Sequence, residues 1–159
     1  MDPKAQNVID TCQNDWEANK ADCSGFLKAV CADLGVAMSA GLADDIVAWF
    51  RDVTNGWEQL TDVTDDAGNV VTRKEELAKN RADAEELVLC GLTSAELGQP
   101  HGHVAVVVSA PLVFSGQNNN YYPIAYWGKL GGVGGEHQGL NFSFGTGSIN
   151  RVTYAAVAF

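Results

Sequence analysis

The chain has 159 residues, 46% of them hydrophobic, and a formal net charge of -10 at neutral pH. Its length and apolar content fit one domain, residues 1–159, with a sizeable core. The negative charge argues against nucleic acid or an anionic membrane as a partner, and no apolar run approaches the roughly 20 residues of a membrane-spanning helix. The acidic residues indicate either a solvated face or a docking face for a basic partner.

Apolar residues at helical spacing predict three helices in the first third of the chain, over residues 5–19, 24–34 and 43–53. The segment Asp65-Asp66-Ala67-Gly68-Asn69 is a strong turn signal and predicts a hairpin between two short strands. Residues 74–84 are charged and predict a fourth helix. The first half of the chain is therefore mainly helical.

The second half has the pattern of a β-sheet. Strands are expected at residues 86–92, 103–109, 121–127 and 152–159. The β-branched run Val104–Val108 is typical of a central strand covered on both faces. Residues 128–147 hold eight of the 17 glycines and predict a flexible loop beside a cleft. Helices followed by strands indicate an α+β fold with N-terminal helices packed on an antiparallel sheet.

Cys23 lies at the expected start of the second helix, within Asp22-Cys23-Ser24-Gly25-Phe26. The positive end of the helix dipole and the unpaired N–H groups of the first turn favour a thiolate there, and they can also stabilise an oxyanion. Gly25 is expected to leave room for a substrate backbone. Asp22 precedes the helix and is a favoured residue type for its N-cap.

His103 lies at the expected start of a strand, within Gly102-His103-Val104. A histidine held there would accept the proton of the thiol and later return one to a leaving amine. His101, in a turn bounded by Gly and Pro, and His137, in the glycine-rich segment, are weaker candidates. Together, Cys23 and His103 make the chain a candidate cysteine hydrolase that acts by acyl transfer.

The other three cysteines, Cys12, Cys31 and Cys90, are expected to be buried as small hydrophobic residues, although Cys31 is close enough along the helix for a resolving role. No C-x-x-C pair is present, so the spacing matches no common zinc site. Neither a metal nor another cofactor is expected.

The motifs Asp22-Cys23-Ser24-Gly25-Phe26 and Gly102-His103-Val104 resemble those of the NlpC/P60 superfamily of papain-like cell-wall peptidases. The agreement extends over nearly the whole chain to the type VI secretion amidase effectors of family one. It includes Thr11-Cys12-Gln13-Asn14-Asp15-Trp16 and, later, Tyr122-Pro123, Trp127-Gly128 and Gln138-Gly139-Leu140.

This resemblance implies a papain-like NlpC/P60 fold, with Cys23 as nucleophile and His103 as base. The implied substrate is the peptidoglycan stem peptide, cut at the bond between γ-D-glutamate and meso-diaminopimelate. The residues that would bind substrate or the oxyanion are Asp22, Ser24, Gly25, Tyr126 and Trp127. Asp22 would either meet the free amine of the stem peptide, as an acidic residue does in related peptidases, or cap the helix.

The resemblance also implies partners and a place of action. The type VI secretion apparatus would export the protein without a cleaved signal peptide, in keeping with the polar residues 1–7. The enzyme would act in the periplasm of a target cell, and a cognate immunity protein would block its cleft. Insertion into a membrane is not expected.

One departure from the superfamily concerns the third catalytic group. Many members orient the histidine with a polar side chain from the next strand, but residues 122–128 contain no His, Asn or Gln. We therefore expect a Cys23/His103 dyad, assisted by a backbone carbonyl or by Tyr126. Two alternative functions stay open at this point, a housekeeping or phage-type wall hydrolase and a non-catalytic acidic binding module.

Overall fold

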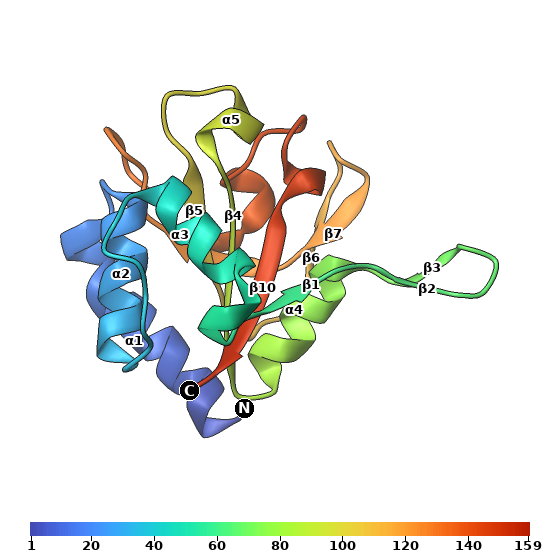
Figure 1. Ribbon diagram of the computed structural model, residues 1–159, viewed down its shortest axis with the longest axis horizontal. Coiled ribbons are helices and arrows are strands. Elements are labelled where there is room, and N and C mark those ends of the chain that lie inside the picture. The colour runs from blue at the N-terminus through green and yellow to red at the C-terminus, as the bar shows by residue number, and fades with distance from the viewer.

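A six-stranded sheet, antiparallel at every pairing, forms the centre of the computed structural model, which describes residues 1–159 (Figure 1). From edge to edge its strands are β1 (Glu58–Leu60), β10 (Thr153–Ala158), β4 (Glu86–Leu92), β5 (His103–Val107), β8 (Ile124–Trp127) and β9 (Gly135–Gly139). The α+β class and the antiparallel sheet predicted from the sequence are thus confirmed. The C-terminal strand β10 lies inside the sheet, between β1 and β4.

Helices cover both faces of this sheet (Figure 1). The α-helices are α1 (Pro3–Asn19), α2 (Cys23–Asp33), α3 (Ala43–Arg51), α4 (Lys74–Asp83) and the short α5 (Ser94–Leu97). Three 3-10 turns, η1 (Val53–Asn55), η2 (Leu140–Phe142) and η3 (Ile149–Arg151), complete the helical elements. The first three helices pack on one face, while α4 and residues around η2 and η3 pack on the other. None of the five α-helices is both long and apolar enough to cross a bilayer.

Strand β5 contributes to both cores, as the sequence predicted for a central strand. Val104 and Val106 belong to the core beneath α1–α3, whereas Ala105 and Val107 belong to the core beneath α4, and all four are fully buried. This alternation follows from the two-residue repeat of a strand. His103 has the parity of Ala105 and Val107, so its side chain belongs to the α4 face of the sheet.

Two predicted segments differ in the structure. The strand expected at 121–127 is divided into β7 (Asn120–Tyr122) and β8, because Pro123 between them has no N–H to donate to a ladder. Strand β7 pairs with β6 (Val113–Ser115) as a separate hairpin. The glycine-rich segment is not one flexible loop, since β9 forms within it and pairs with β8. Gly135 permits this pairing, because a Cβ there would lie 2.2 Å from the ring of Trp127.

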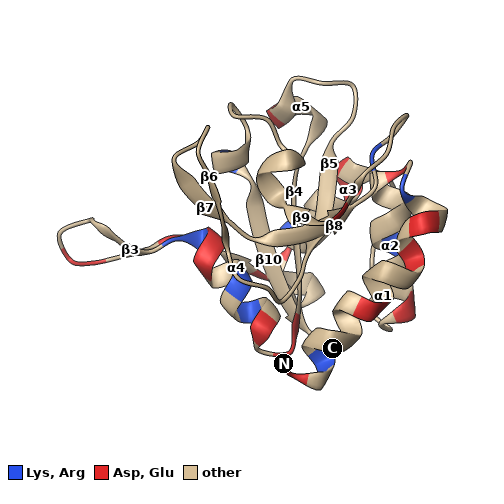
Figure 2. Ribbon diagram, turned by 180° about the vertical axis from the view of Figure 1, so that it is seen from behind, with Lys and Arg blue, Asp and Glu red and all other residues tan.

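The hairpin predicted at residues 65–69 is present and projects from the body of the protein (Figure 1). It consists of β2 (Val63–Thr64) and β3 (Val70–Thr72). Asp and Glu residues are distributed over several elements, including α1 and this hairpin, rather than gathered on one face (Figure 2).

Candidate active site

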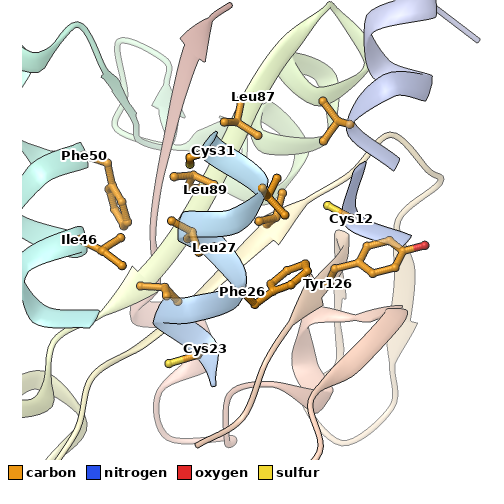
Figure 3. Close-up of a cluster of buried hydrophobic side chains, with 14 of the residues drawn as sticks. Cys12, Cys23, Phe26, Leu27, Cys31, Ile46, Phe50, Leu87, Leu89 and Tyr126 are labelled. Carbon is orange, nitrogen blue, oxygen red and sulfur yellow. The ribbon is translucent and has the colours of Figure 1, made fainter. Parts of the chain in front are cut away.

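Cys23 is the first residue of α2, at the end of the helix that meets the beginning of β5 (Figure 3). Its side chain is buried, and its Sγ lies 4.0 Å from the carbonyl oxygen of Gly102. Gly102 also lets this segment pack closely on α3 and β4, since a Cβ there would lie 2.5 Å from Asp44 Oδ1 and 2.9 Å from the carbonyl oxygen of Leu92. The two sequence motifs therefore meet in space.

Burial raises the pKa of the Cys23 thiol. Backbone N–H groups, foremost that of Val104, lower the pKa, while the nearby charge of Asp22 raises it further. The net direction is upward, contrary to the expectation that the helix start favours a thiolate. The dipole effect is smaller than the cost of ionising a sulfur that water hardly reaches. The resting group is a thiol, which needs a base to become a nucleophile.

His103 begins β5, where its backbone is paired with Leu92 of β4. Its ring contacts the ring of Phe144 edge-on, with centroids 5.0 Å apart. Burial, together with the positive charge of Lys129, lowers the pKa of His103 to about 4. The imidazole is therefore neutral near pH 7, the state in which it can accept a proton.

Ser143 is the polar side chain that contacts His103. Its Oγ lies 2.5 Å from His103 Nε2. Sequence reasoning missed this residue, because Ser143 follows the 3-10 turn η2 rather than lying on the strand next to β5. Nothing in the local pattern Phe142-Ser143-Phe144 distinguishes it from other loop serines. The side chain in contact with His103 is thus a loop hydroxyl and not Tyr126, the side chain expected from the sequence.

Cys23 and His103 line one cavity of about 350 Å³. Trp127, Lys129 and Ser143 are also part of its wall. A second cavity of about 310 Å³ also borders Cys23 and is lined by Asp22, Ser24, Asp44 and Asp45, among others. The two cavities share Cys23 and the segment Pro100-His101-Gly102, so they adjoin at this cysteine. An extended chain could occupy both spaces and present one bond to the sulfur.

The structure shows how the two neighbours of Cys23, Asp22 and Gly25, are used. Asp22 has the backbone conformation of an N-cap, but its side chain accepts no backbone N–H of the helix. It accepts instead a hydrogen bond of 3.0 Å from Ser24 Oγ and borders the second cavity. Gly25 borders neither cavity, and a Cβ there would lie 2.6 Å from Asp22 Oδ2. Gly25 therefore makes room for the Asp22 carboxylate rather than for a substrate backbone.

Tyr126 and Trp127 point to opposite faces of the sheet. Tyr126 lies in the core with Phe26 and Cys12, and its hydroxyl has no hydrogen-bond partner (Figure 3). Its side chain belongs to the core on the α1–α3 face, and its hydroxyl makes no hydrogen bond to His103. Trp127 is on the same face as His103 and lines its cavity.

Of the remaining histidines and cysteines, His101 alone borders the cavity that contains His103. His101 borders both spaces, whereas His137 lies on β9 and packs edge-on against Tyr126. Cys12, Cys31 and Cys90 are fully buried, and all four cysteines are free, so the prediction of three buried apolar cysteines is confirmed. No group of three or more His, Cys, Asp or Glu side chains is arranged to hold a metal ion.

Comparison with known proteins identifies one relative along most of the chain. The protein is 32% identical over 147 residues to the peptidoglycan amidase Tse1 of Pseudomonas aeruginosa, covering 88% of this chain and 80% of the relative. The chain belongs to the amidase effector family of Tse1. No family model matches the chain. The resemblance stated from the sequence motifs is thereby confirmed.

Membership of the Tse1 family gives the paired cysteine and histidine a chemical context. An amidase must attack a carbonyl carbon, stabilise the resulting oxyanion and protonate a leaving amine. Cys23 lies among backbone N–H groups at a helix start, and His103 is a neutral base on the wall of the same cavity. This arrangement is compatible with the three functions that the reaction requires.

Proposed function

We propose that the protein is an antibacterial cysteine amidase that hydrolyses the bond between γ-D-glutamate and meso-diaminopimelate in peptidoglycan stem peptides. One observation carries this proposal. In a chain related to a peptidoglycan amidase over 88% of its length, Cys23 and His103 lie on the wall of one cavity. The two flanking spaces fit a substrate that extends on both sides of the bond to be cut.

The proposed reaction begins when one ring nitrogen of His103 takes the proton of the Cys23 thiol. The sulfur forms a bond to the γ-carbonyl carbon, and the electron pair of the carbonyl moves to its oxygen. Backbone N–H groups at the start of α2 donate hydrogen bonds to this oxyanion. The carbon–nitrogen bond then breaks, His103 gives its proton to the leaving amine, and a γ-glutamyl thioester remains on Cys23.

Hydrolysis completes the cycle. His103 takes a proton from a water molecule, whose oxygen attacks the thioester carbon, and the thiolate leaves and is reprotonated. For the nitrogen other than Nε2 to accept these protons, Nε2 must carry its hydrogen and donate it to Ser143 Oγ. Ser143 would thus fix the tautomer that makes His103 a base.

The direct test is digestion of purified Gram-negative sacculi, followed by mass spectrometry of the fragments. The wild-type protein is expected to produce a new amino terminus on diaminopimelate, and Cys23→Ala to produce none while keeping the circular dichroism of the folded chain. Cys90→Ala is a matched control, because Cys90 is buried in the core beneath α4. Full activity of Cys23→Ala would refute the cysteine mechanism.

Delivery by type VI secretion, action in a target-cell periplasm and inhibition by an immunity protein form the biological part of the proposal. Expression in a Gram-negative host tests the place of action. The protein fused to a periplasmic signal is expected to lyse the cells, whereas cytoplasmic expression is expected to be tolerated. Lysis from the cytoplasm would contradict this assignment.

A further inference from the structure

The two cavities that adjoin at Cys23 carry side chains of opposite charge. On the His103 side, Lys129 is the sole Lys, Arg, Asp or Glu among the residues that border the cavity. On the other side, the wall carries the carboxylates of Asp22, Asp44 and Asp45 and no Lys or Arg. A substrate with charged groups therefore meets fields of opposite sign on the two sides of the reacting sulfur.

Lys129 forms no ion pair in the structure. Six salt bridges are present, and none includes Lys129, although the chain has 20 acidic and ten basic residues. Its ammonium group is close enough to His103 to lower the pKa of the imidazole. An unpaired cation beside the proposed base is thus available to a ligand.

The backbone fixes the position from which the Lys129 side chain extends. The N–H of Lys129 donates to the carbonyl oxygen of Lys20 at 3.0 Å, and the N–H of Gly132 donates back to the carbonyl oxygen of Lys129 at 3.0 Å. Gly131 has a φ of 72°, which favours glycine in this turn. A Cβ at Gly132 would lie 3.3 Å from Lys129 Cδ, so the turn packs closely along the lysine stem.

We propose that Lys129 is a specificity-determining residue that binds a carboxylate of the substrate next to the bond that is cut. This inference rests on the proposed function and extends it. The stem peptide offers two such groups near the cleavage site, the α-carboxylate of D-glutamate and the side-chain carboxylate of diaminopimelate. An ammonium group on the cavity wall attracts either one and gives no comparable attraction to the corresponding carboxamide.

Binding of a carboxylate by Lys129 would also assist the reaction. The positive charge of Lys129 opposes protonation of His103 in the free enzyme. A carboxylate paired with the ammonium group cancels much of this effect, because opposite charges at short distance offset each other's field. Proton transfer from Cys23 to His103 therefore becomes easier once the correct substrate is bound.

The test measures binding separately from cleavage. Calorimetry with Cys23→Ala would compare the tripeptide L-Ala-γ-D-Glu-meso-diaminopimelate with two analogues, one amidated at the D-glutamyl α-carboxylate and one at the side-chain carboxylate of diaminopimelate. All three peptides keep a free carboxyl terminus. One amide is expected to bind about tenfold or more weakly, the range for a hydrogen bond to a charged group, and its position identifies the carboxylate. In Cys23→Ala/Lys129→Met, the acid and this amide are expected to bind equally.

Lys79→Met is the matched control for the change in net charge, because Lys79 lies on α4 and pairs with Asp83. In the Cys23→Ala background it should retain the discrimination in full, and Lys129→Arg should retain most of it. Equal binding of acid and amides by Cys23→Ala, or discrimination that survives Lys129→Met, would overturn the role of Lys129. Failure of the wild-type protein to cleave the acid tripeptide and intact sacculi, while Cys23→Ala still discriminates, would instead refute the proposed reaction.

Discussion

Ser143 Oγ lies 2.5 Å from His103 Nε2, so a loop residue holds the ring of the proposed base. We expect Ser143→Ala to lower kcat about 3- to 10-fold, the effect of losing one hydrogen bond of ordinary strength, with little change in KM. The reason is that the ring would be free to adopt the other tautomer and other orientations. Steady-state hydrolysis of a stem-peptide substrate measures this effect.

Ser143→Thr is the control for this prediction, because threonine keeps a hydroxyl group at the same position. It should recover most of the lost kcat, whereas a role of Ser143 in packing alone would leave the alanine variant closer to wild type than the threonine variant. A rise in KM at constant kcat would indicate that Ser143 contacts substrate and does not orient His103.

The chemistry of Cys23 gives a second prediction. Since burial raises the pKa of the thiol, alkylation by iodoacetamide should be slow at pH 6 and should accelerate only as the pH exceeds the ordinary thiol range of about 8.5. Cys23 should still react before Cys12, Cys31 and Cys90, because it borders a cavity and they are fully buried. Mass spectrometry of peptides from the labelled protein measures the four rates.

The Cys23→Ser variant lacks this thiol, so the alkylated peptide that disappears in this variant is the one that contains Cys23. A rate for Cys23 that is high and constant between pH 5 and 8 would contradict the prediction, since it would show a thiolate–imidazolium pair already formed in the free enzyme. The difference decides whether substrate binding must assist proton transfer, as the charge of Lys129 beside His103 implies.

The sequence predicted the framework of the site because that framework depends on local patterns. Apolar spacing located α2, and the β-branched run located β5. Cys23 and His103 begin these elements, and the prediction that they act together came from the resemblance of their two motifs to those of NlpC/P60 peptidases. Their catalytic roles stay predictions until the variants are measured.

The parts that sequence reasoning missed depend on long-range packing. Ser143 reaches His103 from 40 positions away, through a turn that no local pattern predicts. Tyr126 was a reasonable partner for His103 by its place in the chain, but strand parity directs it to the opposite face. The low pKa of His103 and the raised pKa of Cys23 arise from burial, which only the assembled fold determines.

The stability of the protein should depend on pH through His103. Its pKa is about 4 in the folded protein and 6.5 without the fold, so the unfolded chain binds more protons between these values. The favourable contribution of neutral His103 is complete above pH 6.5 and is lost as the pH falls to about 4. The loss amounts to about 3 kcal/mol, at 1.36 kcal/mol per pKa unit.

Urea unfolding of wild type and His103→Gln at several pH values isolates this contribution. The variant should lose less free energy of unfolding than wild type between pH 6.5 and 4, by up to the same amount. The comparison is needed because burial raises the pKa of Glu75, which acts on stability in the opposite direction in both proteins. Parallel curves for the two proteins would show that His103 is not buried as a neutral group.

Gly128 controls how the loop after β8 meets the start of α2. A Cβ at this position would lie 2.3 Å from the carbonyl oxygen of Asp22 and 2.6 Å from that of Asn19. The same loop is tied to this connection by hydrogen bonds from Lys129 N and Gly134 N to the carbonyl oxygen of Lys20. We expect Gly128→Ala to displace the backbone next to Cys23 and to cost about 1–3 kcal/mol of stability, as overpacking does.

Activity should fall more steeply than stability in Gly128→Ala, because a shift of about 1 Å in a reacting atom can cost about a hundredfold in rate. Gly116→Ala is the matched control, since a Cβ there meets nothing within 4 Å and Gly116 is not among the glycines with positive φ. Chemical denaturation and the rate of sacculus digestion would be measured for both variants. Equal stability and equal activity of Gly128→Ala and Gly116→Ala would show that contact between this loop and the Asn19–Asp22 backbone does not position Cys23.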